Sequence, residues 1–190
     1  MGAHPRLLGF DEGPFRFGDA SVPVVGVMTR GAARVEAVVV GKVEVDGWDA
    51  THQVIGLARR LPGGGPDAVM IDGVTLGGMN VVDIADVART LERTVLAVTR
   101  DRPDRARMLA AMERTPGAAR RAAMLPPDSP AEVRIEGHAL FVQIAGEPAD
   151  EARLLHLVKA SLHEGYTPEP LRLAHHIATA LVRGVSGTAP

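Results

Sequence analysis

The chain has 190 residues, of which 46% are hydrophobic and 23% charged, and its formal net charge is −2. This apolar content excludes a disordered chain, and the length allows a sizeable core, so we expect one globular domain over residues 1–190. Cysteine is absent, which excludes disulfides, iron–sulfur clusters and thiol catalysis. No apolar run has the roughly 18–20 residues of a membrane-spanning helix. Met1–Phe10 lacks the pattern of a signal peptide, so we expect a cytoplasmic protein without a membrane partner.

The positive charge is concentrated in one segment. Seven arginines and three acidic residues lie between Arg100 and Arg121, so the rest of the chain is clearly acidic. Such a segment is either a patch that faces phosphate groups or a solvated helix with routine charge pairs, and the second interpretation is slightly favoured.

The first half predicts strands with no room for helices between them. Arg6–Phe10, Val22–Met28 and Arg34–Val45 are apolar or rich in β-branched residues, and short turns separate them. A parallel crossover needs about a dozen or more residues, so these three strands must form an antiparallel meander.

Helices and strands then alternate. We expect a helix over Asp49–Leu61, a buried strand over Ala68–Asp72, a helix capped by Asn80 and running to Leu91, a strand over Val95–Thr99, and a helix with Pro103 in its first turn. After the proline-rich segment 126–130, a hairpin over Glu132–Ile144 turns at Glu136-Gly137. Two helices, Pro148–His163 and Glu169–Arg183, complete a mixed α/β sheet fold.

Two carboxylates end apolar strands just before glycine-containing turns. Asp11 closes the first strand and Asp72 closes the strand after the meander. If those strands lie parallel and adjacent, the two carboxylates meet at one edge of the sheet, where open α/β sheets bind ligands. Neighbouring acidic groups repel, and Mg²⁺ is the natural cation between them.

Other polar positions give weaker signals. Asp46 and Asp49 lie where the third strand turns into a helix, and Asp49 and Asp83 suit helix caps. The turn Gly73–Gly78 could cradle a phosphate, although it matches neither the P-loop nor the dinucleotide pattern. His176 falls on a polar stripe of the last helix with Arg172 and Arg183, and His175 sits at the apolar border of that stripe.

Four stretches together resemble a known family, catalogued as domain of unknown function 99 and also called the endonuclease dU or endonuclease V-like family. They are LGFDEGPF (Leu8–Phe15), VDGWDAT (Val45–Thr51), MIDGVTLGGMNVVD (Met70–Asp83) and PEPLRLAH (Pro168–His175). The resemblance extends over nearly the whole chain, and the stretches occur in the family's order.

The resemblance implies a ribonuclease H-like (endonuclease V-like) fold and a metal site. By this likeness Asp11 and Asp72 take the roles of the two family aspartates. Asp46, with Asp49 as the second choice, takes the place of a glutamate, and His175 is the candidate for a group on a late helix. The implied cofactor is Mg²⁺, or Mn²⁺ instead.

The implied reaction is hydrolysis of phosphodiester bonds in a nucleic acid, DNA rather than RNA, beside a deaminated base such as uracil. Phosphates would be held by arginines, for which the candidates are Arg30, Arg100, Arg102 with its neighbours up to Arg107, and Arg172. The aromatic wedge with which endonuclease V reads a base is missing, so a base must be held differently. No obligate protein partner is evident.

Two other functions compete with the nuclease hypothesis. A relative that kept the fold and lost catalysis would bind nucleic acid in a salt-sensitive way without turnover. A nucleotide-binding protein would instead use the turn Gly73–Gly78, and a nucleotide would then raise its thermal stability.

Overall fold

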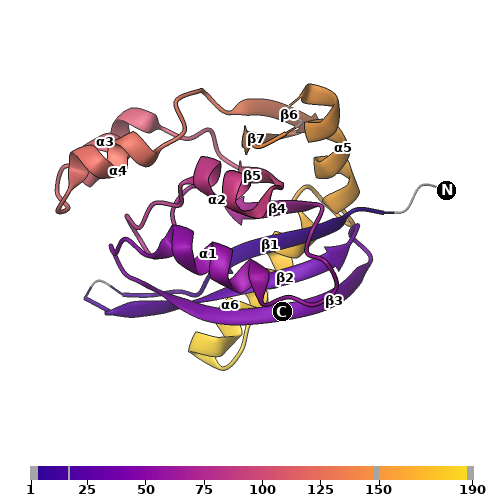
Figure 1. Ribbon diagram of the computed structural model, residues 1–190, viewed down its shortest axis with the longest axis horizontal. Coiled ribbons are helices and arrows are strands. Elements are labelled where there is room, and N and C mark those ends of the chain that lie inside the picture. Colours follow the sequence, from indigo (N-terminus) through magenta and orange to yellow (C-terminus); the bar gives the residue numbers. More distant parts are fainter. Residues whose placement is uncertain (1–3, 17, 148–149, 188–190) are drawn as a thin grey trace.

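A seven-stranded mixed sheet runs through the computed structural model of the chain, in the order β3-β2-β1-β4-β5-β7-β6 (Figure 1). The structure describes residues 4–16, 18–147 and 150–187. The strands are β1 (Arg6–Glu12), β2 (Ser21–Arg30), β3 (Arg34–Glu44), β4 (Ala68–Asp72), β5 (Thr94–Thr99), β6 (Ala131–Ile135) and β7 (His138–Ala145).

Six helices accompany the sheet in the described ranges. They are α1 (Ala50–Arg59), α2 (Ile84–Leu91), α3 (Arg105–Met112), α4 (Ala118–Met124), α5 (Glu151–Ser161) and α6 (Glu169–Arg183). None of these helices has both the length and the apolar character needed to cross a membrane.

The predicted meander and the change to parallel pairing are confirmed. β1 pairs antiparallel with β2, and β2 pairs antiparallel with β3. On its other side β1 pairs with β4 in parallel, and β4 pairs with β5 in parallel. The predicted hairpin is also confirmed, and β7 attaches it to the sheet by pairing antiparallel with β5.

Helices cover both faces of the sheet, because alternate residues of each buried strand point to opposite sides. On one face Leu8 and Phe10 of β1 pack in a core with residues of α1 and α2. On the other face Leu7 of β1 packs in a second core with residues of α5 and α6. This alternation puts Asp11, which follows Phe10, on the face that α6 covers.

Several predicted helix boundaries were wrong. Asp83, and not Asn80, is the N-cap of α2, because its carboxylate accepts a hydrogen bond of 3.0 Å from the Asp86 N–H. Pro103 lies before α3, which Asp104 caps by accepting from the Arg107 N–H.

The ends of the penultimate helix also need correction. Its predicted start at Pro148 lies outside the described residues. α5 is capped by Asp150 and ends at Ser161, short of the predicted end at His163.

Two glycines let α6 lie almost on the backbone of β1. A Cβ atom at Gly9 would lie 2.5 Å from the Pro170 carbonyl carbon, and one at Gly13 would lie 2.8 Å from the Ala178 carbonyl oxygen. Real Cβ atoms do not approach so closely, so glycine is required at both positions. This close packing determines where α6 sits relative to Asp11, which lies between the two glycines.

We therefore expect Gly9→Ala to destabilise the protein, because the added methyl group must push α6 away from the sheet. Overpacking of this kind costs about 1–3 kcal/mol, which thermal unfolding would report as a fall in Tm of several degrees. Gly56→Ala is the matched control. A Cβ at this exposed position in α1 would contact nothing within 4 Å, so alanine should raise helix stability by roughly 0.5–1 kcal/mol. Equal melting of wild type and Gly9→Ala would contradict the close-packing argument.

Candidate functional site

Three carboxylates gather where β1 and β4 end. The parallel register pairs Phe10 with Ile71, so Asp11 and Asp72, one residue further along each strand, lie side by side at the same edge of the sheet. Glu12 is the last residue of β1 and lines the same groove as these two aspartates. The sequence predicted that Asp11 and Asp72 would meet, and the pairing of β1 with β4 brings them together.

His175 of α6 completes this group from above the sheet. Its Nδ1 lies 2.9 Å from Asp11 Oδ2, while the Glu12 N–H donates a 2.7 Å hydrogen bond to Asp11 Oδ1. Both oxygens of the buried Asp11 carboxylate are thus held. The His175 side chain itself is 59% exposed, so the imidazole connects the buried acid to solvent.

Burial and mutual repulsion make these carboxylates hard to ionise. Burial raises the pKa of Asp11 to about 6, and the charge of Asp72 adds to the shift, while the Glu12 N–H and His175 oppose it. Burial likewise raises the pKa of Glu12 to about 8, with the charges of Asp11 and Asp72 adding to it. Burial also raises the pKa of Asp72, whose side chain lies nearer the surface, whereas Arg100 and His175 lower it. The group of Asp11, Glu12 and Asp72 therefore has too little positive charge around it to balance three ionised carboxylates.

An open groove of about 1040 Å³ leads to the carboxylates. Asp11, Glu12 and Asp72 form its acidic end, and the C-terminal half of α6 forms one wall. This wall carries the polar side chains His176, Thr179 and Arg183 besides His175, so the groove combines a negative end with a wall that includes cationic groups.

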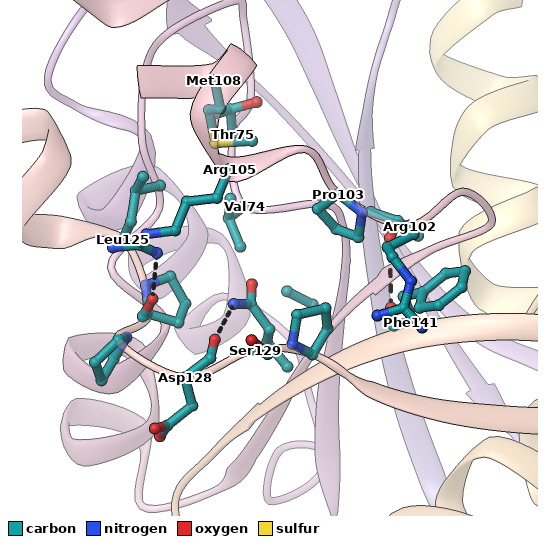
Figure 2. Close-up of a pocket in the computed structure, with 17 residues that line it drawn as sticks. Val74, Thr75, Arg102, Pro103, Arg105, Met108, Leu125, Asp128, Ser129 and Phe141 are labelled. Atoms are coloured by element: carbon teal, nitrogen blue, oxygen red, sulfur yellow. Dashed lines mark hydrogen bonds between the residues drawn. The ribbon is translucent and has the colours of Figure 1, made fainter. Parts of the chain in front are cut away.

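A second, more enclosed pocket of about 490 Å³ begins directly after Asp72 (Figure 2). It lies between the turn that follows β4, the N-terminal part of α3 and the segment before β6. Its walls are largely apolar, with a few polar groups among them; the lining includes Gly73, Val74, Thr75, Thr99, Arg102, Pro103, Arg105, Met108, Leu125, Phe141 and Gln143.

Several backbone N–H groups of the turn Gly73–Gly78 already donate hydrogen bonds within the protein. The Gly73 N–H donates to the Val98 carbonyl, and the Leu76 N–H donates to the Asn80 carbonyl. The backbone N–H of Gly77 helps to lower the pKa of Glu12. The turn therefore supports the carboxylate site, and three of its six N–H groups are already engaged within the protein.

Asp46 does not join the carboxylates, although the resemblance made it a catalytic and metal-binding candidate. Its Oδ1 accepts a 2.8 Å hydrogen bond from the Met79 N–H, and its own N–H donates to the Gly77 carbonyl. Asp46 has a left-handed backbone with φ of 53°, and it does not line the groove that holds Asp11. It connects the turn after β3 to the turn after β4.

Asp49 has a structural position as well. It is the N-cap residue of α1, but its carboxylate makes no capping hydrogen bond. Asp49 Oδ1 instead accepts from the Glu44 N–H and from the Asn80 side chain, whose own Oδ1 accepts from the Ala50 N–H. Asn80, buried completely, thus does part of the capping work for a helix distant in sequence.

Arg121 is the residue of this region that sequence reasoning missed. It belongs to the basic segment but is only 1% exposed, and its guanidinium donates to the carbonyls of Asp46, Gly47 and Met79. The guanidinium also stacks on the Trp48 ring, 4.0 Å from its centroid. Trp48 therefore packs against Arg121 while remaining 36% exposed, and Arg121 faces carbonyls, not phosphates.

The four arginines proposed as phosphate ligands separate into different places. Arg100 and Arg172 line a small cavity of about 270 Å³ with Asp72 and His175. Arg172 also forms a bidentate ion pair with Glu169.

Arg102 lies in the enclosed pocket, over the Phe141 ring (Figure 2). It is also paired with Glu132. Arg30 lies elsewhere. Arg30 of β2 lies opposite Arg6 at the start of β1. Asp11 is five residues further along β1, which is a distance of roughly 17 Å. An ion pair with Glu36 holds Arg30 in its place.

Sequence reasoning missed Glu12. It is adjacent to Asp11, and a strand places adjacent side chains on opposite faces, which argued against a shared site. Glu12 still pairs in register with Val24 of β2, but it is the last residue of β1, and at the end of the strand both side chains border the same groove. Its position at the strand end is the one signal that could have pointed to it.

The donor set fits a hard divalent cation. Carboxylate oxygens with raised pKa values are the ligands that Mg²⁺ or Mn²⁺ would neutralise. In the described residues no three histidine, aspartate or glutamate side chains are arranged to hold a metal ion by themselves. Mg²⁺ commonly binds through one or two carboxylates together with water and substrate phosphate.

Solved structures define the class of fold. Endonuclease V from Streptomyces avermitilis superposes with a TM-score of 0.62 over 96% of this chain and 83% of that one, at 15% identity. Endonuclease V from Ciona intestinalis, in complex with a 24-mer DNA containing an inosine followed by a ribo-adenosine, gives 0.55 over 90% and 82%, at 12% identity. The fold is therefore the ribonuclease H-like fold of endonuclease V.

The family follows from closer relatives. The profile of the Endonuclease dU family matches residues 3–182. A UPF0215 protein of Archaeoglobus fulgidus is 35% identical over 95% of this chain and 96% of its own length. A crystal structure of a protein of unknown function from the same organism has a TM-score of 0.82, with 33% identity over 94% and 99% of the two chains. The chain belongs to the Endonuclease dU family.

The raised pKa of Glu12 predicts how stability depends on pH. The folded protein holds this proton up to about pH 8, whereas the unfolded chain releases it near 4.5, so the free energy of unfolding should fall as the pH rises between these values. Glu12→Gln removes the titration and should therefore be more stable than wild type at pH 8, by about 1 kcal/mol or more, which is roughly 2–4 °C in Tm. Thermal unfolding of both proteins at pH 5 and pH 8, in the presence of a chelator, measures this. The same loss of Tm in both proteins would contradict it.

Proposed function

We propose that this protein is a metal-dependent endonuclease that hydrolyses phosphodiester bonds in DNA. The observation that carries the proposal is the meeting of Asp11, Glu12 and Asp72 at adjacent strand ends, under His175, in an open groove. Membership of the Endonuclease dU family and the fold shared with endonuclease V support it. Repelling carboxylates at the end of a groove suit the binding of a cation together with a phosphate.

Asp11 and Asp72 would hold the cation, Mg²⁺ or Mn²⁺, and Glu12 takes the third acidic position in place of Asp46. When bound, such a cation lowers the pKa of water and stabilises the charge that develops on a phosphate. Asp11 is already oriented for this role by the Glu12 N–H and by His175.

His175 is suited to proton transfer at the open side of the site. Its Nδ1 is engaged by Asp11, and among the described residues its other ring nitrogen makes no hydrogen bond. An imidazole held at one nitrogen and partly exposed at the other can exchange a proton with an attacking water or a leaving oxygen. The carboxylate of Asp11 would stabilise the protonated ring.

Arg100 and Arg172 are the best-placed phosphate ligands of the four considered. Both line the cavity that includes Asp72 and His175, so a strand whose scissile phosphate lies at the carboxylates would pass beside them. Arg183, in the wall of the main groove, could contact the strand further along. Arginine is well suited to such contacts because its planar fork matches a phosphate.

The enclosed pocket would hold an unpaired base, such as the uracil formed by deamination of cytosine, next to the cleaved bond. It opens from the turn directly after Asp72, its walls are apolar, and Thr75, Thr99 and Gln143 offer hydrogen-bonding groups (Figure 2). Arg102 and Arg105 belong to the same lining. A base that has left the stack is usually held by such a combination of apolar walls and a few polar contacts.

The nucleotide-binding alternative is less well supported. The N–H groups of Gly73 and Leu76 already have acceptors in the protein, and that of Gly77 bonds Glu12, so the turn offers a phosphate fewer free donors than a typical phosphate-binding loop. A binding protein without catalysis has the same groove and differs from the nuclease only in turnover.

Cleavage assays test the proposal directly. Labelled duplex and single-stranded DNA, with deoxyuridine, deoxyinosine or no lesion, and a matching RNA would be incubated with Mg²⁺, with Mn²⁺ or with chelator. We expect nicking that needs the metal and falls by about 100-fold or more in Asp11→Asn and in Asp72→Asn, because each loses a charge from the proposed metal site.

Asp46→Asn is the matched control for these variants. The asparagine oxygen can still accept from the Met79 N–H, so this variant should keep both its fold and most of its activity. If Asp46→Asn were as inactive as Asp72→Asn, the metal site would include Asp46 and the assignment of Glu12 would be wrong. Tight, salt-sensitive DNA binding without any cleavage would establish the non-catalytic alternative.

The arginine assignment has a separate test in binding measurements. Arg100→Ala should weaken DNA binding and reduce the slope of log affinity against log salt by about one, because one phosphate contact is lost. Arg30→Ala should leave both quantities unchanged, since Arg30 lies at the opposite end of β1 and is paired with Glu36. Fluorescence anisotropy with a catalytically inactive protein at several salt concentrations measures both, and equal effects of the two variants would contradict the placement.

A further inference from the structure

An aromatic side chain lines the groove close to the carboxylates. Phe15 lies in the loop after β1, four residues beyond Asp11, and borders the same groove as Asp11 and Glu12. It is 37% exposed, whereas Phe10 and Phe141 are buried. A molecule that enters the groove can therefore reach the ring of Phe15.

The other partly exposed tryptophan and tyrosine rings already have partners. The guanidinium of Arg121 lies over the ring of Trp48. Tyr166 stacks on His138, with the ring centroids 4.1 Å apart and the ring planes inclined by 12°. Among the residues that the structure describes, no ring and no guanidinium stacks on Phe15, so this ring remains available for stacking.

The loop that carries Phe15 is held on both sides of the ring. On one side the Gly13 N–H donates a 2.9 Å hydrogen bond to the Pro23 carbonyl, and the backbone of Gly13 packs closely on α6. On the other side the Arg16 N–H donates to the Asp19 carboxylate at 2.7 Å. Because the ring is held in place before a ligand arrives, binding loses less conformational entropy than it would on a free loop.

The groove around Phe15 has the groups that a nucleic-acid strand requires. Asp11, Glu12 and Asp72 form its acidic end, and Arg183 lies in its wall. A guanidinium matches the geometry of a phosphate, and an aromatic face stacks on a base of any kind. One groove thus offers a contact for a base, a contact for a backbone phosphate, and the carboxylates for the phosphate that is cleaved.

The groove and the enclosed pocket extend from the carboxylates in different directions. Asp72, the last residue of β4, belongs to the lining of the groove, and the next residue, Gly73, belongs to the lining of the pocket. The pocket continues toward α3 and β7, while the groove continues along α6 and past Phe15. A strand whose scissile phosphate lies at the carboxylates therefore has one neighbouring base on the side of the pocket and the other on the side of Phe15.

We propose that Phe15 is the stacking platform for the base on the groove side of the cleaved bond, and that the substrate is a strand in which both nucleotides flanking this bond are unpaired. The inference rests on the proposed nuclease function and adds the class of substrate to it. A base inside a duplex is covered on both faces by its neighbours, so it must leave the stack before it can lie on Phe15. Single strands, loops and flaps meet this requirement, whereas a duplex with one extruded base does not.

Binding measurements test the stacking role without depending on turnover. With Asp72→Asn as the parent protein, Phe15→Ala should weaken the binding of a single-stranded oligonucleotide by about 5- to 100-fold, the range for one base–aromatic stack. Phe15→Trp should restore the affinity. The slope of log affinity against log salt should not change in Phe15→Ala, because no phosphate contact is lost, whereas Arg183→Ala should reduce it by about one. Leu181→Ala, at an exposed leucine of α6 outside the lining of the groove, is the control and should bind like the parent.

Cleavage of matched substrates tests the class of substrate. Wild type should cleave single-stranded DNA, and a duplex with two or more adjacent unpaired nucleotides, faster than a duplex with a single unpaired base. Phe15→Ala should lose most of this preference. An abasic nucleotide next to the cleaved bond on the side of Phe15 should weaken binding to the parent protein and have no further effect in Phe15→Ala, because both changes remove the same stack.

The results distinguish the stacking role from the nuclease function. Single-strand binding that Phe15→Ala weakens and Phe15→Trp restores, without cleavage of any substrate, would support the stacking role and contradict the nuclease function. Metal-dependent cleavage with equal rates and equal substrate preference in wild type and Phe15→Ala would support the nuclease function and overturn the stacking role. A parent protein that does not bind single-stranded DNA would also overturn it.

Discussion

The parallel pairing of β1 with β4 is the constraint on which the site depends. Without it, Asp11 and Asp72 would be separated by the sixty residues between them in sequence; with it, they are neighbours at one sheet edge. α6 then lies across β1 at a distance that only Gly9 and Gly13 allow, and this closeness brings His175 to Asp11. Backbone packing, and not attraction between charged groups, therefore assembles the group.

The assembled group is electrostatically unfavourable, and its chemistry follows from that. Burial and neighbouring charges raise the pKa values of Asp11 and Glu12 to about 6 and about 8, so the fold holds these acids together at the expense of stability. Unfavourable burial and repulsion of acidic groups are typical of functional sites, where the rest of the structure supplies the stability that the site costs. A divalent cation would relieve this repulsion and could in turn bind a phosphate, which connects the geometry to the proposed hydrolysis.

A separate polar network stabilises the turns behind the site. Asp46 joins the turn after β3 to the turn after β4, Asn80 and Asp49 connect β3 with α1, and Arg121 donates to three carbonyls of the same region. These residues are polar and close to the groove, yet their hydrogen bonds are satisfied internally. They keep the turn Gly73–Gly78 in position next to Glu12 and the enclosed pocket.

The sequence by itself determined the order of strands and helices, the meander and the hairpin of β6 and β7, because hydrophobic periodicity and loop length are local properties. It also placed Asp11 and Asp72 at strand ends, and the parallel pairing of β1 with β4 then brought them together. The tertiary structure alone decided that Glu12 turns into the groove and that Asp46 turns away from it. It also separated Arg30 from Arg100, buried Arg121 and left β3 at an open edge. These outcomes depend on where a strand ends and on which elements pack beside each other, and contacts between residues far apart in the chain leave no periodic signal in the sequence.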